Sequence, residues 1–183
     1  LMALANHVPQ WNVVGDTFSH DPSIIKNQDG YWLFFTSNGI SMCHSTDGKS
    51  WTWRRNIFGQ NLNWWKTYVP TKKDFNIWAP EIIEKDGKYY LYYSISTFGS
   101  RVSCIGLATC TNLKKPKWVD EGLVINSNNF TPYNAIDPSI VKADDKWYMA
   151  FGSWSEGLYI VELDSNTMKP VHDVKPQKIA TRN

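Results

Sequence analysis

Two aspartates stand at the same place in a repeating pattern, where they could act as a pair of catalytic carboxylates. Asp21 begins the segment DPSII and Asp137 begins DPSIV, whereas the matching segment between them, APEII, has Ala79 at that place. One carboxylate that activates water or attacks carbon, and a second that protonates a leaving oxygen, can cleave a glycosidic bond. Two carboxylates held close together also shift each other's pKa, which lets an acid and a base coexist at one pH.

The aspartates belong to a repeat of 58 residues. Segments 20–37, 78–95 and 136–153 align without a gap, and Pro22, Pro80 and Pro138 mark the same position in each. Each copy reads as an apolar strand, a turn built on Asp-Gly or Asp-Asp, and a second, aromatic-rich strand, which is the pattern of a β-hairpin. Another short strand pair follows each hairpin, so each unit offers about four strands and no sustained helical period.

Units of this kind predict an all-β fold, a β-propeller in which each repeat forms one blade. The blades are expected at about 19–77, 78–135 and 136–183, as the N-terminal part of a single propeller domain. A β-sandwich is the alternative, although it would not account for the regular spacing. Because propellers typically have about four to eight blades, we expect a second polypeptide or a C-terminal fragment to complete the ring.

In a propeller the first strand of each blade lines the central axis, so Asp21 and Asp137 are expected to face one funnel. The alternative is that each aspartate only initiates a turn before proline. Ala79 shows that the repeat can do without a carboxylate at this position, which favours a chemical role for the two aspartates. The turn-forming role nevertheless stays open as the alternative. Glu81 follows Pro80 and should point to the opposite side of its strand from Ala79; we interpret it as structural.

The composition argues against several classes of protein. The chain has 19 Lys and Arg against 17 Asp and Glu, which gives a net charge of +2. We interpret the basic residues as scattered singly along the chain, so no nucleic acid partner is expected. No apolar run approaches the ~20 residues that cross a bilayer. The 15% aromatic content suits a β scaffold or a surface that stacks sugar rings. Cys43, Cys104 and Cys110 have no metal-binding spacing and are predicted to be buried thiols, although Cys104 and Cys110 could pair across a hairpin.

The chain is similar to glycoside hydrolase family 43, and most similar to its endo-1,5-α-L-arabinanases, in the segments HDPSII, WAPEIIEKDGKYYLYYS, GLATCTNL, WVDEGLVI and NAIDPSIVKADDKWYMAFGS. The resemblance implies a five-bladed β-propeller of which about three blades are present here, an inverting mechanism, and α-1,5-linked arabinan or arabino-oligosaccharide as substrate. It also implies that Asp21 is the general base, that Asp137 tunes the pKa of the general acid, and that this acid is a glutamate of the fourth blade, beyond Asn183. No cofactor is required, and a calcium ion on the propeller axis would be held mainly by residues outside this chain.

The same resemblance implies a set of substrate contacts. Trp78 and Phe98 match the family's stacking platforms for arabinose rings. His20 could hydrogen-bond a sugar hydroxyl or hold a central ion or water, and a purely structural histidine is the alternative. Three further residues match positions near the cleavage site, namely Asn134, Ile136 and Ser153.

Other functions fit the same residues. An exo-acting arabinofuranosidase or β-xylosidase would share the fold and differ in loops that block one end of the cleft. A non-catalytic carbohydrate-binding propeller fragment would lack the general acid. The opening LMALANHVPQ has small residues in a cleavage-like pattern, so we expect a secreted protein, although vector-derived residues would read the same way.

Overall fold

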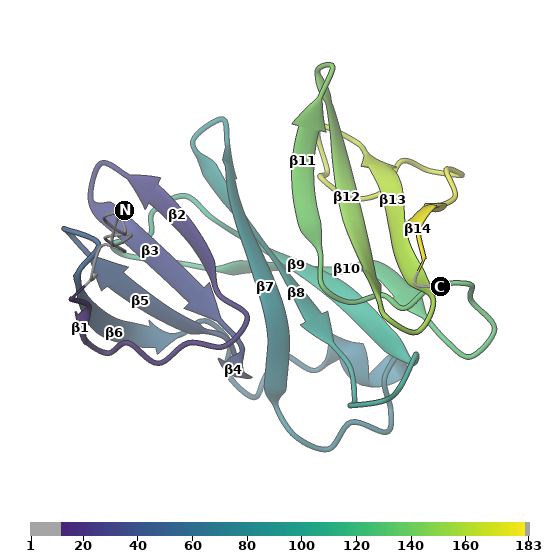
Figure 1. Cartoon of the computed structure of the whole chain (residues 1–183), viewed down its shortest axis with the longest axis horizontal. Helices are drawn as coiled ribbons and strands as arrows, with labels where there is room; N and C mark the ends of the chain where they lie inside the picture. Colours follow the sequence, from purple (N-terminus) through teal and green to yellow (C-terminus); the bar gives the residue numbers. More distant parts are fainter. Residues whose placement is uncertain (1–11, 182–183) are drawn as a thin grey trace, which may run out of the picture.

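The computed structural model describes residues 12–181, so the opening segment LMALANHVPQ lies outside the described residues. Three β-sheets stand next to one another, and the innermost long strand of the middle sheet contacts those of both neighbours (Figure 1). The short 3-10 helix η1 (Trp64–Thr67) is the only helical element in this part of the chain. The predicted all-β fold is confirmed.

Four antiparallel strands, consecutive along the chain apart from the two-residue β4, form the body of each sheet, and the first and second sheets each add one two-residue strand. The first sheet holds β1 (Val14–Gly15), β2 (Ser23–Asn27), β3 (Gly30–Phe35), β5 (Ser41–Ser45) and β6 (Ser50–Asn56). The second holds β4 (Ser37–Asn38), β7 (Asn76–Lys85), β8 (Lys88–Ile95), β9 (Ser103–Cys110) and β10 (Val119–Ser127). The third holds β11 (Ser139–Ala143), β12 (Lys146–Ser153), β13 (Gly157–Leu163) and β14 (Gln177–Ala180).

The hairpins that open the second and third sheets have the predicted two-residue turns. Lys85 pairs with Lys88 across Asp86 and Gly87, which have φ of 53° and 75°. The equivalent turn between β11 and β12 is Asp144 and Asp145, with φ of 48° and 63°. Both positions of such tight turns need positive φ, which Gly and Asp tolerate better than other residues.

The core consists of two apolar clusters on opposite faces of the middle sheet. Successive side chains of β8 enter the two clusters in turn, because side chains alternate between the two faces of a strand and both faces are covered here. One cluster packs the first sheet and η1 against the middle sheet, with Trp32, Phe34, Met42, Trp65, Leu91 and Tyr93 buried. The other packs the middle sheet against the third, with Tyr92, Ile105, Leu107, Met149, Phe151 and Val161 buried.

The three cysteines are buried free thiols. Cys104 and Cys110 both belong to β9, near opposite ends of one extended strand, and therefore cannot form the bridge across a hairpin that their spacing left open. Burial raises the pKa of the Cys104 thiol to about 12 and, together with the charge of Asp16, the pKa of Cys43 to about 11. These thiols stay protonated and act as small apolar side chains of the core.

The inner strands β2, β7 and β11 belong to separate sheets, and side-chain oxygens link them at the spacing of the repeat. In the first kind of bridge, a hydroxyl at the end of one sheet's second long strand accepts the N–H of the residue before proline in the next sheet. Thr36 Oγ1 accepts from Ala79 N at 2.8 Å, and Ser94 Oγ accepts from Asp137 N at 3.0 Å.

A second kind of bridge lies beyond the proline. Ser23 Oγ accepts the N–H of Ile82 at 3.1 Å, and Glu81 Oε1 accepts the N–H of Ile140 at 3.3 Å. Ser23 and Glu81 occupy equivalent positions of the repeat, and Ser23 Oγ also donates to Glu81 Oε2 at 2.9 Å. Glu81 thus joins all three inner strands, in agreement with the structural interpretation of this residue.

The bridge through Thr36 should contribute measurably to stability. We expect Thr36→Val to lower the free energy of unfolding by about 1–3 kcal/mol, because the Ala79 N–H loses its acceptor while the shape of the buried side chain is kept. Urea denaturation measures this change. Thr52→Val, at an exposed position of β6, is the matched control and should change stability by less than about 0.5 kcal/mol. Equal effects of the two substitutions would contradict the role of the bridge.

Candidate active site

In each sheet the residue directly before the proline of the repeat is in the left-handed conformation; Asp21 and Asp137 precede β2 and β11, and Ala79 lies within β7. Asp21, Ala79 and Asp137 have φ of 48°, 36° and 55°. A residue before proline normally adopts an extended conformation, and the left-handed region costs an alanine about 1–2 kcal/mol. Since Ala79 adopts the same backbone shape without a carboxylate, the shape belongs to the repeat. The carboxylates of Asp21 and Asp137 are therefore not needed for the turn, which favours a chemical role for them.

The carboxylate of Asp21 is half-exposed and oriented by its own sheet. Thr36 Oγ1 donates to Asp21 Oδ2 at 2.9 Å, while the same hydroxyl oxygen accepts the N–H of Ala79. His20 Nε2 lies 3.4 Å from Asp21 Oδ2. Among the described residues no donor contacts Oδ1. One oxygen is thus fixed by protein and the other is free for a water molecule.

The structure brings Asp137 into electrostatic contact with Asp21. Desolvation by the surrounding strands raises the pKa of the Asp137 carboxyl, and the negative charge of Asp21 raises it further. Asp137 nevertheless remains accessible to solvent, so a ligand can reach it. The charge of Asp21 therefore acts on Asp137 across 116 residues of sequence (137 − 21), and the role of the two aspartates in one site stays a prediction.

The two predicted aromatic platforms differ in their surroundings. Phe98 follows β8 and is 95% exposed, so its ring is accessible for stacking against a sugar. Trp78, in β7, is half-buried, and Lys72 Nζ lies 5.3 Å from the centre of its ring. Lys72 is itself buried; it donates to Ser96 O at 2.9 Å and pairs with Asp74 Oδ1 at 2.7 Å. This hydrogen bond to Lys72 is the main reason that the pKa of Asp74 is lowered.

Of the three positions expected near the cleavage site, Asn134 and Ile136 lie in the connection before β11, and Ser153 ends β12. Asn134 is buried, accepts from Ser103 Oγ at 2.8 Å, and donates to Ser100 O and to Ser153 Oγ at 3.3 Å. Ile136 O accepts the N–H of Gly152 at 2.9 Å. Asn134 is thus occupied by protein partners, and of these three positions Ser153 and Ile136 keep partly exposed side chains.

Sequence reasoning missed three side chains that hold this site. Thr36 and Ser94 occupy one position of the repeat, and their hydroxyls could have been noticed at the end of two otherwise apolar strands. Lys72 lies in a loop outside the aligned segments, where nothing in the sequence signals a buried ammonium group beside Trp78.

Within residues 12–181 the structure contains no group of three or more His, Cys, Asp or Glu side chains suited to a metal ion. The expected calcium ion on the axis therefore stays a prediction about residues outside this chain. No helix in the same range is long and apolar enough to cross a membrane.

The comparisons with known proteins assign the chain to a family. A model described as glycosyl hydrolases family 43 matches residues 11–182, so the chain belongs to this family. It is 44% identical over 156 residues to an extracellular endo-α-(1→5)-L-arabinanase of Bacillus subtilis (strain 168), which covers 82% of this chain and 48% of that protein. It is 36% identical over 168 residues to an extracellular exo-α-(1→5)-L-arabinofuranosidase of Cellvibrio japonicus, which covers 88% of this chain and 48% of that protein.

Solved structures agree with this assignment. An endo-arabinanase from Bacillus licheniformis superposes with a TM-score of 0.88 at 43% identity, covering 94% of this chain and 59% of that one. A Cellvibrio cellulosa α-L-arabinanase complexed with arabinohexaose superposes with a TM-score of 0.83 at 33% identity, covering 88% and 53%. The resemblance drawn from the sequence motifs is confirmed. The chain spans about half the length of the curated relatives it matches.

Removal of the Asp21 charge should change the titration of Asp137. We expect Asp21→Asn to lower the pKa of Asp137, yet to leave it above its ordinary value, because desolvation is the larger cause of the shift. Carbon-detected NMR of the carboxyl group measures this pKa directly. Asp16→Asn, which removes a carboxylate near β1, should leave it unchanged. A pKa of Asp137 that does not respond to Asp21→Asn would show that the two groups do not interact.

The raised pKa of Asp137 also predicts how stability depends on pH. The folded state binds the Asp137 proton more tightly than the unfolded state does, so this group's contribution to stability falls as pH rises from its ordinary pKa through its raised one. Relative to the unsubstituted protein, Asp137→Asn should therefore have a more favourable Tm at about pH 7 than at about pH 3. Thermal unfolding at the two pH values checks the sign, and the opposite sign would contradict the shift.

Proposed function

We propose that this chain is part of a glycoside hydrolase that cleaves α-1,5-linked L-arabinan by an inverting mechanism. The observation that carries the proposal is the pair of left-handed aspartates at the starts of β2 and β11, close enough for the charge of Asp21 to raise the pKa of Asp137. Membership of family 43, and relatives named for their action on arabinan, support the choice of substrate.

Asp21 is proposed as the general base. Its ionised carboxylate, held by Thr36, takes a proton from water as the water oxygen forms a bond to the anomeric carbon. The bond from that carbon to the glycosidic oxygen breaks, and the general acid gives its proton to this leaving oxygen. One displacement inverts the configuration at the anomeric carbon.

Asp137 is proposed to tune the general acid. A negative charge beside a carboxylic acid raises the pKa of that acid, which keeps it protonated until the leaving oxygen needs the proton. The charge of Asp21 already raises the pKa of Asp137 in this way. Asp137 is therefore assigned a positioning and electrostatic role, while Asp21 contacts the reacting water.

We further propose that polypeptide beyond this chain, as a C-terminal part or a second chain, completes the propeller and supplies the general acid. The relatives' greater length supports this. The bridges between sheets support it too, because Ser139 stands where Ser23 and Glu81 stand in the earlier sheets and is exposed at the start of β11. A fourth sheet would give Ser139 the backbone N–H that its equivalents bind.

The relatives support proposals for the mode of cleavage and for the location. An endo-acting enzyme is our leading proposal, and the similarity to an exo-acting arabinofuranosidase supports exo action as the second candidate. Mixed oligomers released from linear arabinan would indicate endo action, and a single small product would indicate exo action. Two relatives are extracellular proteins, so we propose the same location for this one.

The role of Asp21 is tested in the protein with its complete propeller. We expect Asp21→Ala to lower kcat on linear arabinan by at least about 100-fold with little change in KM, because the water loses its base while the sugar contacts stay. Reducing-end release measures the rate, and NMR of the first product checks inversion.

A structural effect of the substitution must be separated from a chemical one. Ala79 shows that alanine is accepted at this position of the repeat, so Asp21→Ala should keep the fold and the Tm within a few degrees. A folded Asp21→Ala variant that retains full activity would refute the assignment of the base. Calorimetric binding of arabino-oligosaccharide without any hydrolysis by the complete protein would instead support a carbohydrate-binding propeller.

A further inference from the structure

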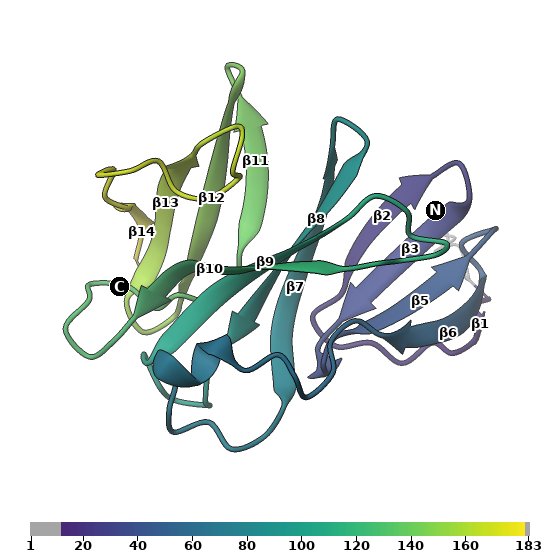
Figure 2. The same ribbon diagram turned by 180° about the vertical axis from the view of Figure 1, so that it is seen from behind.

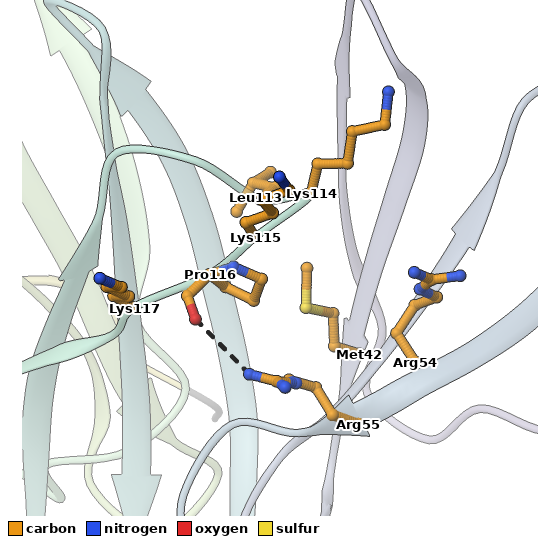
Figure 3. A pocket seen from close by; sticks show the side chains of 8 residues that line it. All are labelled: Met42, Arg54, Arg55, Leu113, Lys114, Lys115, Pro116 and Lys117. Carbon is orange, nitrogen blue, oxygen red and sulfur yellow. Dashed lines mark hydrogen bonds between the residues drawn. The ribbon is translucent and has the colours of Figure 1, made fainter.

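A strongly basic pocket lies between the first and second sheets, away from the candidate active site. Figure 3 shows its lining, which comes from β5 and β6 of the first sheet and from the connection between β9 and β10. Figure 2 shows this connection reaching across toward the first sheet. The pocket has a volume of about 400 Å³ and is lined by Met42, Arg54, Arg55, Leu113, Lys114, Lys115, Pro116 and Lys117.

Five of these eight side chains are cationic, and all five are exposed. Two of the five have a tie within the protein: Lys114 Nζ lies 3.1 Å from Asp29 Oδ1, and Arg55 Nη1 donates to Pro116 O at 3.5 Å. Within the described residues the other three have no carboxylate within ion-pair distance. Uncompensated positive charge concentrated in one concave site is the feature that attracts an anion.

The sequence interpretation of scattered basic residues was wrong at this place. Arg54 and Arg55 lie near the end of β6 in the first unit. Lys114, Lys115 and Lys117 lie in the second unit, about 60 residues further along the chain. The packing of the second unit's connection against the first sheet unites them. Neither group alone would make a site.

We propose that this pocket binds the carboxylates of an acidic polysaccharide, a chain of uronic acid residues. Arginine pairs with a carboxylate through two parallel hydrogen bonds, and lysine adds a mobile point charge. The remaining lining, Met42, Leu113 and Pro116, offers an apolar surface for the face of a sugar ring. The pocket therefore presents both parts that a uronate residue needs.

The choice of a polysaccharide rests on the proposed function. Arabinan is neutral and gains nothing from a cationic pocket, so the ligand here must differ from the chain that is cleaved. A branched polysaccharide that carries neutral arabinan on an acidic backbone would engage the pocket and the active site together. Binding at a second site raises the effective concentration of the cleavable chain without any new contact at the active site.

Nucleic acid is the other polyanion that basic pockets bind, and the lining argues against it. Proteins that bind single strands combine a basic groove with aromatic side chains on which the bases stack. None of the eight residues that line this pocket is aromatic. The site offers charge and an aliphatic surface, which suits a sugar acid better than a base.

The test is calorimetric titration of the protein with a short oligogalacturonate at about 50 mM and about 500 mM salt. Arg54→Gln/Lys115→Gln/Lys117→Gln removes the three unpaired charges and leaves the ties of Arg55 and Lys114 in place. We expect it to weaken binding at low salt by at least about tenfold. Lys49→Gln/Lys66→Gln/Lys175→Gln removes the same charge from exposed positions elsewhere and should leave binding within about twofold.

Each outcome decides the proposal. Weaker binding of the fully methyl-esterified oligosaccharide, and loss of affinity at high salt, support it. Equal weakening by the two triple variants, or tighter binding of a single-stranded oligonucleotide of matched charge, would overturn it. Because oligogalacturonate binding is measured without arabinan, absence of binding in an active arabinanase would refute this inference alone, and binding without arabinan cleavage would refute the proposed function alone.

Discussion

The inner strands of neighbouring sheets lie side by side without a shared backbone ladder, so side chains of one sheet accept the N–H groups on either side of the proline in the next sheet. Thr36 and Ser94 do this for the residue before proline, and Ser23 and Glu81 for the second residue after it. These bridges tie each sheet to the inner strand of the next one. The two apolar clusters pack the middle sheet against its two neighbours.

The same constraint explains why chemistry can reside at the start of an inner strand. Asp21, Ala79 and Asp137 all adopt a left-handed conformation before proline, and Ala79 demonstrates that this conformation does not require a carboxylate. The first and third sheets therefore present a carboxylate there on a backbone already fixed by the repeat. Thr36 connects the two functions, since its hydroxyl accepts from the backbone of the next sheet and donates to Asp21.

Much of this could be read from the sequence because it is periodic. The 58-residue spacing predicted three hairpin-led sheets, and it predicted that Asp21 and Asp137 face one funnel; the charge of Asp21 does raise the pKa of Asp137. Contacts between residues at non-equivalent positions of the repeat could not be predicted in this way. The basic pocket joins Arg54 to the loop of Lys115, and buried Lys72 lies beside Trp78, through packing that no local pattern encodes. The substrate contacts at His20, Trp78, Phe98, Asn134, Ile136 and Ser153 stay predictions, because their roles depend on a bound sugar.

We propose that the left-handed aspartates of the first and third sheets border one reacting bond. A crystal structure of the complete protein, inactivated by Asp21→Asn and bound to an arabino-oligosaccharide, tests it most directly. We expect a glycosidic bond placed between the inner strands, with a water molecule held by residue 21 in line with the anomeric carbon and Asp137 on the side of the leaving oxygen. An oligosaccharide bound with its glycosidic bonds remote from both positions would contradict it.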